Sequence, residues 1–431
     1  MNHIALTIGP IYKTLANAKK PNELWSSSYI FSYIMKQIIK EFKDRDFIMP
    51  YIKDDTIFDD NFDIGLFHDR FIFKSEPNDL EQLKESIDKV LKVLSIDLDV
   101  EYNFLKNYFQ INFIEKDVKE NAILELTPYL DTLELQFNIS QYETNLLKEK
   151  LLKTDNFFLK NKDSKIASLQ HIASQNYIAI VHVDGDKMGE VIKDKNNISN
   201  VSKNLFEYCQ KSHKIITRFG GETVFAGGDD LLFFAPVVNK DKTKTIFNLC
   251  DEISEDFNKR FNLKATLSFG IHIAYEKYPL YEALENSRDL LFSKAKSGAK
   301  NNIAFRVTKH SGQTFETIIH KGNKEVYENF LIFSSNIKSK DGMDNFLHSL
   351  HHKIDTYKTT IDLIAQDKSR LKNFFDNYFN NDIHKQYQDF FTQLIDFIYE
   401  VYQDKNIKDD DRLNIIYSTL RFIKFIQGNK K

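Results

Sequence analysis

Residues 223–236 restrict the fold of this chain more than any other segment. They read Thr-Val-Phe-Ala-Gly-Gly-Asp-Asp-Leu-Leu-Phe-Phe-Ala-Pro, so two apolar runs surround Gly227–Asp230. The pattern predicts a strand, a tight turn and a second strand. Glycine permits a close backbone approach, and adjacent carboxylates suit a hard cation such as Mg²⁺. We therefore expect a β-hairpin whose turn a metal–nucleotide complex could approach.

The composition favours a folded protein with several domains. The 431 residues suggest two to four domains, and a hydrophobic fraction of 42% is enough for real cores. A net charge of −3 excludes a polycation that binds nucleic acid by charge alone. Cys209 and Cys250 make neither a disulfide framework nor a four-cysteine zinc site. Without an evident signal peptide or an apolar run of about 20 residues, we expect a cytoplasmic protein and no membrane partner.

Glycine and proline are distributed unevenly along the chain. Six of the fourteen glycines fall between Gly185 and Gly228, and no proline follows Pro279. The middle is therefore expected to be rich in turns and the last third to be helical. Apolar spacing predicts an α+β unit at the start, a second α/β unit from residue 177 and a helical bundle from about residue 325.

A second acidic turn follows an apolar strand predicted at residues 177–183. It reads Val-Asp-Gly-Asp-Lys-Met-Gly and ends at Gly189. Because ligands gather at strand ends in open α/β sheets, we expect Asp184 to face a metal and Asp186 to point to the opposite face. Asp-Gly-Asp is also ordinary turn chemistry. If the two acidic turns converge on adjacent strands, Asp184 and Asp229 could hold one or two Mg²⁺ or Mn²⁺ ions.

A lysine-rich segment closes the helix predicted at residues 280–297. It contains Lys296 and Lys300. Cations are favoured at helix C-termini, so simple complementation of the helix dipole is one interpretation. The alternative is a clamp in which these two lysines hold a triphosphate.

Taken in order, these motifs resemble the nucleotide cyclase/polymerase palm. The details are similar to one branch, the large palm subunit of type III CRISPR effector complexes in its type III-B form. The segments that carry the resemblance span about two thirds of the chain: Ile8-Gly9-Pro10, Leu24-Trp25-Ser26-Ser27-Ser28-Tyr29, Phe67-His68-Asp69-Arg70-Phe71, Asp184–Gly189, Gly227–Asp230, Ser268-Phe269-Gly270-Ile271, Pro279-Leu280 and Lys300-Asn301.

The resemblance implies an α+β fold with two ferredoxin-like palm domains of the nucleotide cyclase type, packed face to face around ATP. The expected units are a first palm without an acidic motif at 1–119 and a linker or small helical domain at 120–175. A second palm with the Gly-Gly-Asp-Asp motif follows at 176–315, and a C-terminal helical domain at 325–431.

The resemblance also implies roles for individual residues. Ser27 and Ser28 would line an adenine pocket in the first palm. Asp184, Asp229 and Asp230 would be catalytic and bind the metal, and Asp230 would also orient or deprotonate the attacking hydroxyl. The nucleotide would be held by further residues of the second palm: Gly185, Asp186, Lys187, Gly227, Gly228, Lys296 and Lys300.

The implied activity is that of a metal-dependent nucleotidyltransferase. The 3′-hydroxyl of one ATP would attack the α-phosphate of another and release pyrophosphate, giving cyclic oligoadenylate once a target RNA is bound. The implied partners are a guide RNA, the target RNA, repeated backbone subunits and a small helical subunit. Three alternatives stay open: transfer of ATP onto S-adenosylmethionine, a catalytically inactive structural subunit, and a stand-alone dinucleotide cyclase. The last usually has Glu and Phe where this chain has Asp230 and Leu231.

The sequence departs from the family pattern in two places. Many members begin with a His-Asp nuclease domain, whereas here the first palm begins at the N-terminus. We therefore expect a short form without DNA nuclease, and we interpret His68-Asp69 as structural. Many members also carry a four-cysteine zinc site, which two cysteines cannot supply, so no zinc is expected. His348, His351 and His352 are expected on a solvent-facing helix.

Overall fold

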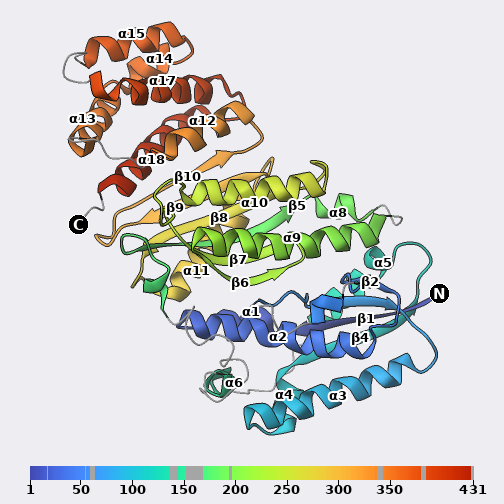
Figure 1. Ribbon diagram of the computed structural model, residues 1–431. Coiled ribbons are helices and arrows are strands. Elements are labelled where there is room, and N and C mark those ends of the chain that lie inside the picture. Colours follow the sequence, from blue (N-terminus) through green and yellow to red (C-terminus); the bar gives the residue numbers. More distant parts are fainter. Residues whose placement is uncertain are drawn as a thin grey trace.

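The computed structural model describes nine stretches of the chain, and everything below refers to them: residues 1–16, 18–53, 55–58, 64–135, 144–151, 168–193, 197–336, 343–379 and 385–428. The elements stack in three tiers (Figure 1). A four-stranded sheet lies at one end, a six-stranded sheet lies in the middle, and a group of helices lies at the other end.

The first sheet is antiparallel and runs in the order β2-β3-β1-β4. The side chains of β1 alternate between the two faces of the sheet. Ile4, Leu6 and Ile8 point into the main core, whereas Ala5 packs on α5. The other helices lie on the main-core side. The bounds are β1 (Asn2–Gly9), α1 (Ile11–Ala16), α2 (Pro21–Glu41), β2 (Phe47–Met49), η1 (Asp55–Phe58), β3 (Arg70–Lys74), α3 (Asp79–Leu98), α4 (Tyr102–Tyr108), β4 (Gln110–Asp117) and α5 (Ala122–Glu134).

The second sheet runs in the order β10-β9-β8-β5-β7-β6, and only β8 and β9 pair in parallel among its neighbours. Helices α9 and α10 cover one face, while α11 and η4 pack on the other. The bounds are β5 (Tyr177–Asp186), α8 (Met188–Val191), α9 (Ile198–Phe219), β6 (Glu222–Gly227), β7 (Asp230–Pro236), α10 (Ile246–Arg260), β8 (Thr266–Tyr275), α11 (Leu280–Asp289), η4 (Leu290–Ala295), β9 (Asn302–Thr308) and β10 (Thr314–His320).

An aromatic cluster joins the C-terminal helices to the second sheet. The ring of Phe247 on α10 lies 4.9 Å from that of Phe330 and 4.7 Å from that of Phe422. His348 and His352 are exposed, as expected, while His351 lies against Tyr417. The bounds are α12 (Lys324–Ser334), α13 (Met343–Thr356), α14 (Lys358–Ile364), α15 (Lys368–Tyr378), η5 (Lys385–Tyr387), α17 (Gln388–Gln403) and α18 (Asp409–Gly428).

The structure confirms the predicted α+β class with two sheets, and it confirms the β6–β7 hairpin. The strand predicted at 177–183 continues to Asp186. The helical linker predicted at 120–175 lies partly outside the described residues, which omit 136–143 and 152–167. Its described parts are α5, which packs on the first sheet, α6 (Thr144–Leu151), which packs on α2, and η2 (Leu169–His171) with its flanks. The domain boundaries remain a prediction.

Two histidines of the second sheet predict how stability depends on pH. Burial, then the charges of Arg288 and Arg306 respectively, lowers the pKa of His182 and of His272 to about 4. Both are neutral in the folded protein at pH 7, whereas an unfolded histidine titrates near 6.5. The unfolded chain therefore binds more protons between pH 6.5 and 4, so the free energy of unfolding falls as pH drops through that window.

We expect thermal melting to show this loss and His272→Gln to reduce it. His272 has no exposed surface and bonds through Nε2 to Oγ1 of Thr308 at 2.9 Å. It accounts for up to about 3 kcal/mol of the loss. The measurement is the melting temperature of both proteins at pH 7.5 and pH 5. An identical pH dependence in wild type and variant would contradict the prediction.

Candidate functional site

The Gly227–Asp230 turn lies at the tip of the β6–β7 hairpin. Gly227 pairs with Asp230 across the ladder, and Gly228 has a φ of +66°, a conformation that favours glycine. On the side of the turn that faces α9, the thiol of Cys209 donates a hydrogen bond to the carbonyl oxygen of Gly228, with 3.3 Å between the sulfur and the oxygen. Burial raises the pKa of Cys209, so the thiol stays protonated and able to donate. The turn is thus fixed against the helix below it.

The two acidic turns converge, as the sequence predicted. β5 pairs with β7, and a Cβ placed on Gly185 would clash with Oδ2 of Asp229 and lie 2.7 Å from its Cβ. The Asp229 carboxylate therefore rests on the backbone beside Asp184. Burial raises the pKa of Asp229, although backbone hydrogen bonds from its own amide and from Gly185 oppose this rise. Only glycine at position 185 leaves room for this contact.

Lys296 neutralises the acidic end of β5. Its ammonium forms an ion pair with Asp184, donates to the carbonyl oxygen of Gly185 at 2.8 Å and lies 4.0 Å from Oδ1 of Asp186. Burial, and then the charge of Lys300, lowers the pKa of Lys296 to about 8. The lysine-rich end of the helix thus faces the acidic turn. A role confined to the helix dipole does not explain these contacts.

The side of the strand on which Asp186 lies differs from the sequence prediction. Asp186 was expected to point away from Asp184, yet Lys296 approaches both carboxylates. Residues two apart in a strand share a face, which is the physical reason for the error. Asp186 has no exposed surface, and its Oδ2 accepts hydrogen bonds from three groups: Ser268 Oγ at 2.8 Å, Thr266 Oγ1 at 3.1 Å and the Asn301 amide at 2.9 Å. It therefore braces β5 against β8 and the Lys300 loop.

Ser27 and Ser28 lie on α2, away from the acidic turns in sequence but facing the same sheet. Both are buried, and α2 packs against β6. Leu24, one turn earlier on the same helix face, belongs to a cluster with Val224 of β6. Within the described residues, Oγ of Ser27 is buried without a hydrogen-bond partner. The Ser27 hydroxyl is thus enclosed by protein atoms on a helix that packs against β6.

The structure also brings His68 and Asp69 to the turn, which sequence reasoning missed. A Cβ placed on Gly228 would lie 2.6 Å from Cε1 of His68. Burial lowers the pKa of His68 to about 4, so the ring is neutral. Crowding by protein atoms raises the pKa of Asp230, with smaller contributions from Asp229 and Asp69, even though Asp230 still reaches solvent. The Phe-His-Asp-Arg-Phe segment was visible in the sequence, but its place beside the turn was not.

The acidic residues fit a hard divalent cation by their chemistry. Asp184, near the end of β5, and Asp229, in the β6–β7 turn, supply carboxylate oxygens, and Oδ1 of Asp186 is buried without a hydrogen-bond partner in the described structure. No group of three or more His, Cys, Asp or Glu in the described part of the chain is already arranged to hold a metal. The Lys296 ammonium contacts Asp184 in this structure. A metal ion bound by Asp184 would therefore have to displace this ammonium or bind the carboxylate together with it.

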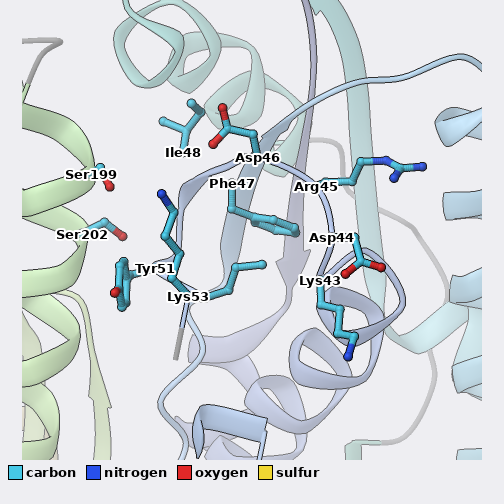
Figure 2. A pocket seen from close by; sticks show the side chains of 11 residues that line it. Lys43, Asp44, Arg45, Asp46, Phe47, Ile48, Tyr51, Lys53, Ser199 and Ser202 are labelled. Carbon is cyan, nitrogen blue, oxygen red and sulfur yellow. The ribbon is translucent and has the colours of Figure 1, made fainter. Parts of the chain in front are cut away.

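A pocket of about 290 Å³ opens elsewhere between the two sheets. Figure 2 shows Ser199 and Ser202 of α9 facing Tyr51 across it, while the side chain of Arg45 turns away. None of the predicted site residues lines this pocket. The candidate site at the acidic turns therefore lies outside this pocket.

No helix in the described ranges has both the length and the hydrophobicity needed to cross a bilayer.

The two sheets, the acidic hairpin and the converging aspartates define a protein of the nucleotide cyclase/polymerase palm class. Residues 177–304 match the family model of the second palm domain of Cas10/Cmr2. Residues 3–98 match that of the N-terminal domain of the CRISPR-associated protein Cmr2. The chain belongs to the Cas10/Cmr2 family, the large subunits of type III CRISPR systems.

Individual relatives agree with this assignment. Subunit Cmr2 of the CRISPR Cmr system of Pyrococcus furiosus is 28% identical over 216 residues, which are 42% of this chain and 24% of that protein. The chain therefore matches about a quarter of the length of this curated relative. A Csm1-Csm4 cassette in complex with cA4 is similar with a TM-score of 0.54 at 13% identity, over 99% of this chain and 69% of that one. The complex with cA3 gives 0.52 at 12% identity, with the same coverage. These two structures support the fold.

We expect Gly185→Ala to disrupt the site without unfolding the protein. The added methyl group would push Asp229 off the backbone, at a cost of about 1–3 kcal/mol in stability. Binding of Mn²⁺ together with ATP, measured by calorimetry, should weaken at least tenfold, roughly 1.4 kcal/mol. Gly189→Ala is the matched control, because a Cβ there meets nothing within 4 Å. Equal binding by the two variants would refute the proposed role of this contact.

Proposed function

We propose that this chain is the signal-producing subunit of a type III-B CRISPR complex, a metal-dependent nucleotidyltransferase that converts ATP into cyclic oligoadenylate. The observation that carries the proposal is the contact of Asp229 with Gly185, which brings two acidic turns together beside Lys296. Solved Csm1-Csm4 cassettes of similar fold are in complex with cA4 and cA3. Those ligands belong to those proteins, and they support ATP-derived chemistry in a fold of this kind.

The acidic residues would serve the donor ATP. Asp184, Asp229 and Asp230 would hold Mg²⁺ or Mn²⁺, which when bound neutralises phosphate charge and lowers the pKa of a nearby hydroxyl. Glycine at positions 185 and 228 lets the Asp229 carboxylate and the His68 ring pack directly against the two turns, and in the proposal the turn backbone approaches the phosphates. Gly227, Asp186 and Lys187 complete this cradle in the proposal.

The chain's own groups would then support the transfer. Asp230 is exposed at the turn, so its carboxylate could reach the attacking 3′-hydroxyl and accept its proton. The new bond joins that oxygen to the α-phosphorus, the bond from the α-phosphorus to the bridging oxygen breaks, and pyrophosphate leaves. Lys296 and Lys300 would take up the charge of the leaving pyrophosphate. The unpaired hydroxyl of Ser27, with Ser28, would contact an adenine ring.

The partners and the location follow from the same proposal. The subunit would act in the cytoplasm with a guide RNA, repeated backbone subunits and a small helical subunit, and a matching target RNA would switch it on. The relatives of known structure were solved as complexes of more than one subunit. The mild net charge of −3 is consistent with RNA contacts that are shared with those subunits.

Replacing both Asp229 and Asp230 with Asn should abolish product formation. The amides keep the shape of the side chains but remove the metal ligands and the proton acceptor, so we expect a loss of at least about a hundredfold, roughly 3 kcal/mol of transition-state stabilisation. The assay is product formation from ATP by the assembled complex with guide and target RNA. Asp241→Asn, an exposed carboxylate beyond the opposite end of β7, is the control. Undiminished synthesis by the double variant, with assembly intact, would overturn the proposal.

The acceptor requires its own measurement. We propose ATP as the acceptor, and transfer onto S-adenosylmethionine is the alternative outcome. The activated complex is incubated with ATP, with and without S-adenosylmethionine, and the products are identified by mass spectrometry. Cyclic oligoadenylate in both incubations supports our proposal. A conjugate formed only when S-adenosylmethionine is present would replace the acceptor while leaving the nucleotidyltransferase chemistry in place.

A further inference from the structure

The residues before and after His68 are both hydrogen-bonded to elements of the first domain. The amide of Phe67 donates to Oγ of Ser32 on α2 at 2.9 Å. The carbonyl oxygen of Asp69 accepts from the amide of Ile8, at the end of β1, also at 2.9 Å. Phe67 is itself buried in the main core. With a fixed neighbour on either side, the position of His68 is set by the first domain.

The ring of His68 occupies the space where a side chain at Gly228 would lie. A Cβ placed on Gly228 would fall 2.6 Å from Cε1 and 3.1 Å from Nδ1 of this ring, and a Cβ on Gly227 would fall 3.5 Å from Nδ1. On its other side the turn is held by the Cys209 thiol. The catalytic turn is therefore enclosed between a helix of its own domain and a residue of the other domain.

The same helix that anchors His68 also carries the predicted adenine-pocket serines. Leu24, Ser28 and Ser32 recur at intervals of four along α2, so they share one face, and all three are buried. Leu24 packs with the β6 side of the hairpin, and Ser32 holds the segment before His68. One helix thus links the predicted adenine-pocket serines to the residue that packs on the Gly227–Asp230 turn.

We propose that His68 is a positioning residue through which the first domain fixes the Gly227–Asp230 turn in its metal-binding conformation. This inference rests on the proposed function, since it assigns the geometry of the same site. It acts by packing, because no hydrogen bond of the described structure joins His68 to the turn. A flat ring of similar size should therefore replace it, whereas a small side chain should release the turn.

Calorimetry on the full chain, with Mn²⁺ and an ATP analogue that carries a methylene bridge between its α- and β-phosphates, tests the proposal. His68→Ala should weaken binding about tenfold, and His68→Phe should restore it to within about threefold of wild type. His272→Gln is the control for loss of a buried histidine, because it lies at β8 and bonds to Thr308. Thermal melting accompanies each measurement, so that folding and binding are recorded separately.

A double-mutant cycle tests the contact itself. Gly228→Ala introduces both backbone strain at φ +66° and a clash with His68. In a His68→Ala background the clash disappears and only the strain remains, so the second substitution should cost about threefold to tenfold less affinity than it does in wild type. Additive effects would overturn the inference, as would wild-type binding by His68→Ala.

The outcomes for the inference and for the proposed function are distinguishable. If wild type binds the Mn²⁺–analogue pair and His68→Ala binds it equally well, only the positioning role fails. If wild type does not bind the pair, the proposed metal–nucleotide site fails and the inference fails with it. Weaker binding by His68→Phe and His68→Ala alike, with normal melting, would show that packing is not the means and would also overturn the proposal.

Discussion

The candidate site depends on one close contact, that of the Asp229 carboxylate with the backbone at Gly185. The β5–β7 ladder brings the two acidic turns to the same end of neighbouring strands, but a ladder alone leaves side chains at ordinary spacing. Because residue 185 has no Cβ, Asp229 can settle directly beside Asp184. Glycine at this position is therefore a structural condition for the chemistry, and the rest of the site is arranged around it.

Concentrating carboxylates in a folded protein costs free energy unless their charges are compensated. This chain compensates each one differently. Lys296 pairs with Asp184, two hydroxyls and an amide bind Asp186, and backbone hydrogen bonds from its own amide and from Gly185 favour the charged form of Asp229. These contacts place the Lys296 ammonium beside the proposed metal site, where it would lie close to a phosphate that enters with the metal.

The local pattern of the chain predicted its local structure well. The apolar runs around Gly227–Asp230 gave the hairpin, and the acidic turn after β5 was found because it follows a strand. The face of Asp186 was predicted wrongly, although strand alternation contains the correct answer. His68 could not be placed, because residues 68 and 228 meet only after two domains have packed, and no periodicity in one segment encodes its partner in another. Long-range packing of this kind is settled by the whole fold.

The boundary between the two domains is built for close approach. Ser28 and Ser32 present small side chains on one face of α2, which packs against β6 and holds the His68 segment. Larger residues there would hold the helix further from the hairpin, and the ring of His68 would then no longer contact Gly228. The turn geometry, the proposed nucleotide pocket and the domain packing consequently depend on the same few contacts. A movement of one domain relative to the other would alter all three together, which is the physical basis on which a bound partner could control such a site.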